Sequence, residues 1–205
     1  MNCKKMIIKI GMLCALLCVV SLSRQQYRQV LQQSIAKKVI RFHVLANSDS
    51  HYDQQVKKQV RDDVGAYVEP LLKRSKDKET SRRILLAHLQ DITEVANRSL
   101  ARQGASYTAY ATLAYSDFPQ KTYQGFRFPS GRYEALRVVI GQGRGHNWWC
   151  VMYPNLCFSE AVKKENVKQW RHFLKSLSQR EFEELIRGKK WKVRWKFLEY
   201  FMERG

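Results

Sequence analysis

The chain has 205 residues, of which 37 are Lys or Arg and 18 are Asp or Glu, and its formal net charge is +19 at pH 7. This length is enough for one domain with its own hydrophobic core, and the sequence has no internal repeat or low-complexity region, which excludes a repeat array. The positive charge predicts attraction to an anionic partner, although solubility and a solvated charged helix face would explain it equally well.

The N-terminal residues follow the pattern that the export machinery reads. Lys4, Lys5 and Lys9 precede an apolar run over residues 10–22, which ends in small residues around Ser23. A permanent membrane-spanning helix usually needs about 20 apolar residues, and this run is shorter. Residues 1–23 are therefore predicted to be a signal peptide cut after Ser23, with an uncleaved N-terminal anchor or a buried helix as alternatives. Export argues against a nucleic-acid partner and favours anionic lipid headgroups or an anionic cell wall.

The next part of the chain predicts a tether and the first half of a domain. Residues 24–37 are polar and Gln-rich, so we interpret them as a tether to a domain over residues 38–205. Residues 39–45 are rich in β-branched side chains, which indicates a strand. A helix should follow, because valines recur every four residues at positions 56, 60, 64 and 68. A second helix is predicted over residues 77–103, with Gly104 as its C-terminal stop.

The middle of the chain favours strands. Residues 107–115 alternate aromatic, small and Thr side chains, and residues 133–140 and 146–153 form two further predicted strands. Only the glycine-rich turn 141–145 separates the last two, so they are expected to pair as a hairpin. Another helix should open at Ser159. Residues 191–197 favour an edge strand, and a helix stripe fits them almost as well.

These elements together predict the fold class. It is α/β or α+β: one mixed domain whose sheet, including a 133–153 hairpin, is covered by amphipathic helices after the N-terminal helix.

One polar segment lies between the first predicted strand and helix. Its ordinary interpretation is a turn in which Asn47 or Ser50 caps the helix and the acids complement the helix dipole. The functional interpretation is a polar pocket at the carboxyl end of a strand. The residues concerned are His43, Asn47, Ser48, Asp49, Ser50 and Asp53.

A second segment combines glycines with two adjacent tryptophans. Gly141, Gly143 and Gly145 weakly resemble a phosphate loop, but a strand rather than a helix is expected to follow them. Trp148 and Trp149 should point to opposite faces of a strand. One of them could be an exposed protein-binding anchor, or both could be buried under a helix.

The two cysteines outside the export segment, Cys150 and Cys157, allow several chemistries. They could form a disulfide across the turn at Pro154, or remain reduced and buried. Cys150 with His43 or His146 could be a nucleophile and base of an exported cysteine hydrolase or amidase that acts on cell wall material. The two cysteines and two histidines could also bind zinc, although their spacing matches no standard site. A disulfide would exclude both chemistries, and no cofactor or metal is expected.

The C-terminal region is strongly basic, with interleaved tryptophans at 170, 191 and 195. It could rest on an anionic membrane surface, or it could be a solvated face.

Two blocks of sequence resemble a known family. The first is residues 40–54 (IRFHVLANSDSHYDQ) with Val60-Arg61-Asp62, and the second is residues 133–151 (YEALRVVIGQGRGHNWWCV). Together they are similar to the two motifs of the stage II sporulation protein R family, over roughly residues 39–158 and the signal segment. The C-terminal part matches only loosely.

The resemblance implies a signalling protein of endospore-forming bacteria and not an enzyme. Such a protein is exported by the forespore into the space between the two membranes that separate it from the mother cell. There it would activate a membrane-embedded aspartic protease that processes the pro-sigma-E precursor. Under this interpretation the expected contact or structural determinants lie in the two motifs: His43, Asn47, Ser48, Asp49, Ser50, Asp53, Glu134, Arg137, Gly145, His146, Asn147, Trp148 and Trp149.

Overall fold

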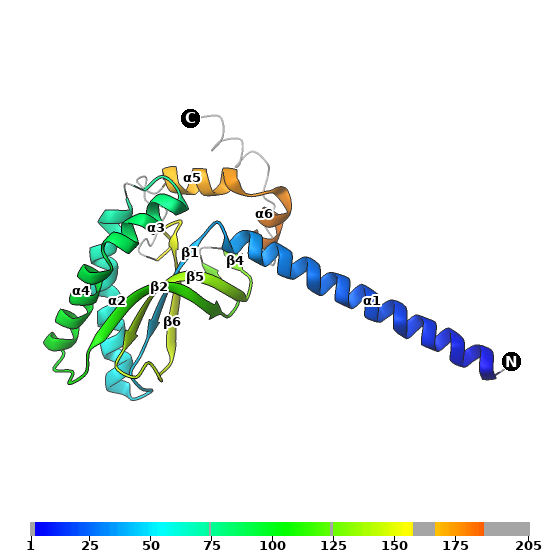
Figure 1. Cartoon of the computed structure of the whole chain (residues 1–205), viewed down its shortest axis with the longest axis horizontal. Coiled ribbons are helices and arrows are strands. Elements are labelled where there is room, and N and C mark those ends of the chain that lie inside the picture. The colour runs from blue at the N-terminus through cyan, green and yellow to red at the C-terminus, as the bar shows by residue number, and fades with distance from the viewer. Residues whose placement is uncertain (1–2, 74, 124, 158–166, 187–205) are drawn as a thin grey trace.

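The computed structural model describes residues 3–73, 75–123, 125–157 and 167–186, and it has the mixed α and β architecture that the sequence predicts (Figure 1). The helices are α1 (Cys3–Ala36), α2 (His51–Leu72), α3 (Lys78–Ala87), α4 (Leu89–Arg102), α5 (Val167–Ser176) and α6 (Gln179–Ile186). The strands are β1 (Ile40–Leu45), β2 (Ala109–Phe118), β3 (Lys121–Tyr123), β4 (Phe126–Phe128), β5 (Gly131–Ile140) and β6 (Asn147–Tyr153).

The main sheet has four strands in the order β2-β5-β1-β6. β1 runs parallel to β5 and antiparallel to β6, and β2 pairs antiparallel with β5. The hairpin predicted for residues 133–153 is therefore wrong: both strands exist, but β1 lies between them. The physical reason is that β1 is buried along almost its whole length on both faces, which suits a central strand and not an edge.

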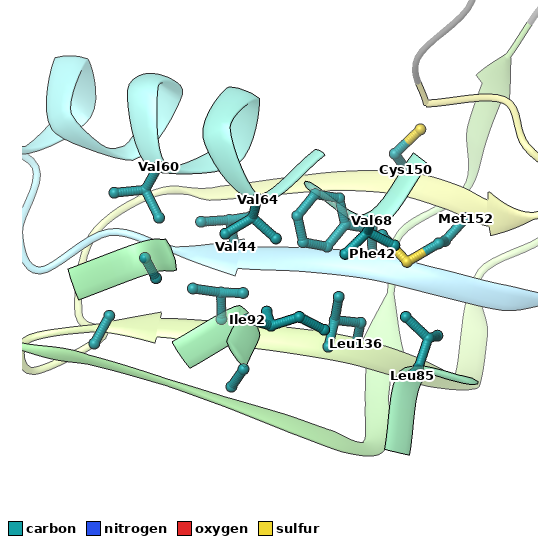
Figure 2. Packing of buried hydrophobic residues seen from close by; sticks show 14 of the residues in the cluster. Phe42, Val44, Val60, Val64, Val68, Leu85, Ile92, Leu136, Cys150 and Met152 are labelled. Atoms are coloured by element: carbon teal, nitrogen blue, oxygen red, sulfur yellow. The ribbon is translucent and has the colours of Figure 1, made fainter. Parts of the chain in front are cut away.

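The helices α2, α3 and α4 cover one face of this sheet. The valine stripe of α2 packs on Phe42 and Val44 of β1, with Ile92 of α4 and Leu136 of β5 in the same cluster (Figure 2). Val56, Val60, Val64 and Val68 are all buried, as their spacing predicts.

The helix predicted over residues 77–103 is two helices in the structure. His88 leaves the helical region, with φ −110° and ψ 14°, and α3 ends there while α4 begins. The change of direction lets α4 pack against both α2 and β2. Gly104 has φ 73°, which suits its predicted role as the stop after α4.

Among the described elements, those on the opposite face cover only one end of it. There Leu31 and Ile35 of α1 join Tyr133 of β5, Phe128 of β4 and Phe173 of α5 in a second cluster. α1 continues without a break through the predicted tether, so this segment is helical and its last turns belong to the core of the domain. Three predictions lie outside the described residues: the strand or helix at 191–197, the start of a helix at Ser159, and most of the basic C-terminal region.

Candidate interaction site

Two loops meet at the carboxyl end of β1. The backbone N–H groups of Arg144 and Gly145 donate to the carbonyls of Asn47 and Ala46 at 3.2 and 2.9 Å. The side chain of Asn47 also accepts from the backbone N–H of Gln142 at 3.0 Å. The glycine-rich turn over residues 141–145 is therefore fixed against the β1–α2 turn.

Two separate structural features explain why glycine occupies three positions of this turn. Gly141 and Gly143 have positive φ angles of 54° and 63°, a conformation that other residues adopt at a cost. At Gly145 the reason is close approach, because an added Cβ atom would lie 2.1 Å from the carbonyl oxygen of Ser48. These backbone angles and this close approach account for the three glycines of the turn.

Asp53 is the buried centre of the β1–α2 turn. Its carboxylate accepts from Asn47 Nδ2 at 2.9 Å, from Ser48 Oγ at 2.5 Å and from the hydroxyl of Tyr107. Burial raises the pKa of Asp53, but the hydrogen bonds from Ser48, Tyr107 and Asn47 outweigh it and the net pKa is lowered. Ser50 occupies the N-cap of α2, and its Oγ accepts from the backbone N–H of Asp53 at 3.1 Å. The capping interpretation therefore describes this turn, and Tyr107 is a partner that the sequence pattern missed.

Asp49 and His146 join the two loops at the surface. The backbone N–H of His146 donates to Asp49 Oδ1 at 2.5 Å, and the ring Nδ1 lies at the same distance. These hydrogen bonds, the backbone one first, lower the pKa of Asp49. Lys57 on α2 donates from Nζ to the carbonyl of His146 at 2.7 Å. His146 is thus part of the loop connection.

The remaining predicted residues divide between the two faces of the sheet. On the helix-covered face, Glu134 accepts from Arg82 at 2.7 Å and from Lys78 at 3.1 Å, which ties β5 to α3. Trp148 packs edge-on against Phe42 at 5.4 Å on the same side. Glu134 thus has a structural role as an ion-pair partner of α3, and Trp148 packs against the core cluster under α2.

His43, Arg137, Asn147 and Trp149 converge on the opposite face. His43 pairs in register with Arg137 of β5 and with Trp149 of β6, and its ring stacks on Trp149 at 6.1 Å. Trp148 and Trp149 therefore point to opposite faces, as the strand geometry predicts. Burial, with Arg137 and Arg41 nearby, lowers the pKa of His43 to about 4, so this imidazole is neutral near pH 7.

Several polar atoms of this group have no hydrogen-bond partner among the described residues. They are both ring nitrogens of His43, Nε of Arg137, Oδ1 of Asn147 and Nε1 of Trp149. Buried polar atoms are paired in the great majority of cases, so such a concentration on one face is unusual. Five of the ten such atoms among the described residues belong to this group, and others, such as Nε of Arg127 and Oε1 of Gln169, lie elsewhere in the fold.

Arg41 is a further buried residue that the motif analysis did not single out. Its guanidinium carbon lies 4.3 Å from the ring centroid of Phe118 and 4.9 Å from that of Tyr133, and Nε donates to the carbonyl of Cys150 at 2.9 Å. Burial lowers the pKa of Arg41, and no described carboxylate pairs with it. The sequence signal was a charged residue inside a mostly apolar strand.

The structure does not assemble the catalytic or zinc candidates. Cys150 and Cys157 are joined as a disulfide, with Cα atoms 5.5 Å apart. Cys150 faces the helix-covered side of β6, whereas His43 faces the other side of the sheet. Within the described residues no group of three or more metal-binding side chains occurs.

Comparison with known proteins gives a consistent result. A sequence model of the family described as Stage II sporulation protein R matches residues 36–163, which is more than half of the chain. Stage II sporulation protein R of Bacillus subtilis (strain 168) is 36% identical over 140 residues, covering 66% of this chain and 62% of the relative. The chain thus spans less than two thirds of that relative's length. No solved structure matches it. Both sequence blocks and both loops of the site lie inside the matched region, so this chain belongs to the stage II sporulation protein R family.

Proposed function

We propose that this sporulation protein is an exported signal that activates a membrane-embedded aspartic protease, which then processes the pro-sigma-E precursor. The signal would act in the space between forespore and mother cell, and the protease would supply the chemistry. The observation that carries the proposal is the family membership, together with a rigid two-loop site that contains both family-like sequence blocks.

The N-terminal helix supports the export part of the proposal. Over residues 9–36 it is long and apolar enough to cross a membrane, and none of its most apolar window is buried in the fold. Leu13, Leu16 and Leu22 are each more than half exposed. Such a continuous apolar surface is unfavourable in water and fits a signal peptide or a membrane anchor.

The arrangement of the cysteines supports a signal over the rival cysteine hydrolase. A disulfide leaves Cys150 without a thiolate, which is the nucleophilic form of cysteine. The neutral His43 is on the other face of the sheet and cannot act as its base.

Reconstitution of the full chain with the protease and its precursor in proteoliposomes tests the proposal. The chain should increase conversion of the precursor, measured as the fraction processed over time. Absence of any increase, with a chain shown to be folded by circular dichroism, would contradict it.

Two matched variants separate a signal from a hydrolase in the same assay. Cys150→Ser and Cys157→Ser should reduce signalling to a similar degree, and a reductant should reproduce both effects. A hydrolase predicts instead that only Cys150→Ser abolishes activity.

A further inference from the structure

Half of one sheet face is uncovered by the described elements. At its covered end Tyr133, Ala135 and Val151 are completely buried under α1, α5 and β4. Toward the loop end of the same face, Tyr110 is 52% exposed, and the following residues are partly exposed: Thr112, Ala114, Arg137, Asn147 and Trp149. We call the group Thr112, His43, Arg137, Asn147 and Trp149 the open face. In Figure 1, α2 and α4 lie along the other side of the sheet, and α1, α5 and α6 gather near one end.

Among the described residues, the open face carries positive charge and no acid. The only acids in the four strands of the main sheet are Asp117 and Glu134, and strand alternation puts both on the helix-covered side. Glu134 is in any case paired with α3. Arg137 makes no ion pair with a described carboxylate, and Lys121 adds a second cation 5.2 Å from the ring of Trp149. The charge of this surface is therefore complementary to a carboxylate.

The residues of the open face point to the same ligand chemistry. Arg137 of β5 and Trp149 of β6 lie on either side of His43, and both side chains are partly exposed. Nε of Arg137 and Nε1 of Trp149 are themselves buried and lack an acceptor among the described residues, so an incoming carboxylate would meet the exposed part of the Arg137 side chain. Arg is the side chain whose geometry suits a carboxylate best, and Trp with Arg is typical of the energetic centres of protein interfaces.

We propose that the open face binds a carboxylate-bearing, acidic segment of the partner protein, with Arg137 as the residue that pairs with the carboxylate. The identity of the partner protein rests on the proposed function. The acidic chemistry of the bound segment is inferred from the open face alone. The chain's own residues 187–205 are a poor occupant, because they carry more Lys and Arg than Asp and Glu and would meet a surface of like charge.

Thr112 offers a test that does not remove any existing contact. It lies on β2 directly opposite Arg137 in the strand register and is partly exposed. Thr112→Glu should place a carboxylate beside Arg137 and occupy the binding site from within the chain, while opposite charges across two strands support the fold. Thr112→Gln is the matched control, because Gln has nearly the same size as Glu and carries no charge. Arg137→Gln removes the cation itself, and Arg98→Gln on the exposed side of α4 is the control for loss of one positive charge.

Binding is measured on the full chain in detergent with ¹⁵N-labelled tryptophan. The probes are the N-acetylated, C-amidated tripeptide Glu-Asp-Glu and its uncharged counterpart Gln-Asn-Gln. The acidic peptide should shift the indole resonance of Trp149 in a saturable, salt-sensitive way, and the uncharged peptide should not. Thr112→Glu and Arg137→Gln should abolish the shift, whereas Thr112→Gln and Arg98→Gln should retain it. Equal shifts with both peptides, or wild-type titration of Thr112→Glu, would overturn the proposal. The proposal would also be overturned if the acidic peptide had no effect and the chain instead bound anionic phosphatidylglycerol vesicles in a way that depends on Arg137.

The processing assay separates this inference from the proposed function. If the wild-type chain activates the protease, Thr112→Glu should lower processing by about tenfold or more while Thr112→Gln stays near wild type. Full activity of a folded Thr112→Glu chain would refute the open-face inference and leave the proposed function standing. If the wild-type chain activates nothing but still binds the acidic peptide, the proposed function fails and the open-face inference stands.

Discussion

Glu181→Gln should weaken the attachment of α6 to the end of α1, because Glu181 is the buried anion that joins them. Only 2% of this residue is exposed. Its carboxylate accepts from Ser34 Oγ, from Lys38 Nζ and from the backbone N–H of Ser178, each at 2.6 Å. Ser178 and Glu181 also form a capping box at the start of α6, which gives the contact a second local role.

The size of the effect follows from the pKa of Glu181. Burial raises it, but the hydrogen bonds from Lys38, Ser34 and Ser178 outweigh burial and lower the pKa from its ordinary value of 4.5 to about 2. Each unit between the two values corresponds to about 1.4 kcal/mol, and Lys38 is partly solvated, so the ionised form contributes about 2–3 kcal/mol. Because the folded pKa is below the unfolded one, this stability is present above about pH 4.5 and is lost as the pH falls toward about 2.

Urea denaturation of the full chain in detergent at several pH values measures this contribution. At pH 7 Glu181→Gln should unfold with about 2–3 kcal/mol less free energy than wild type, and the gap should nearly close near pH 2, where about half of the wild-type carboxyl is protonated in the folded state. Glu183→Gln, on the exposed side of the same helix, is the control and should change stability by less than about 0.5 kcal/mol. A gap of equal size at pH 7 and pH 2, or none at pH 7, would refute the reasoning.

Three further predictions concern the loops of the site and the disulfide. Asp53→Ala removes a buried acceptor of three side-chain hydrogen bonds and should cost about 3–5 kcal/mol in the same denaturation assay; a loss under about 1 kcal/mol would contradict its central role. Gly145→Ala should cost about 1–3 kcal/mol, since its Cβ atom must push the carbonyl of Ser48 away, and melting at the wild-type temperature would disprove the close approach. Cys157→Ser should lower stability by about 2 kcal/mol, and reductant should lower wild type by a similar amount and leave the variant unchanged; a reductant effect on the variant would argue against the Cys150–Cys157 bond.

Local patterns were sufficient for the elements whose signal lies within one turn or one strand. The valine spacing of α2 led to its buried stripe, and Ser50 follows the capping rule because its donor is three residues away. The break at His88 was missed, because Ile84, Leu85, Leu89 and Ile92 continue one helical stripe across it. The direction of α4 depends instead on its packing against β2. The spacing of apolar residues along a helix carries no information about such a contact with a distant strand.

For the site, the sequence supplied the residues and not their grouping. His43, Arg137 and Trp149 belong to three strands, and only the strand order brings them to one face. Tyr107, which completes the contacts of Asp53, is 54 residues away in the chain and gave no motif signal. Thr112, opposite Arg137, was invisible for the same reason.

The sequence by itself determined the export-like N-terminal helix, the family and the presence of strands at 39–45, 133–140 and 146–153, because hydropathy and short-range spacing encode these features. Only the tertiary structure decided that β1 separates β5 from β6. That choice depends on which strand can bury both of its faces, a comparison among strands whose paired residues are 94 to 113 positions apart in the chain. It also decided which polar residues are structural and which are unpaired, because a hydrogen-bond partner is set by distance in space and not by position in the chain.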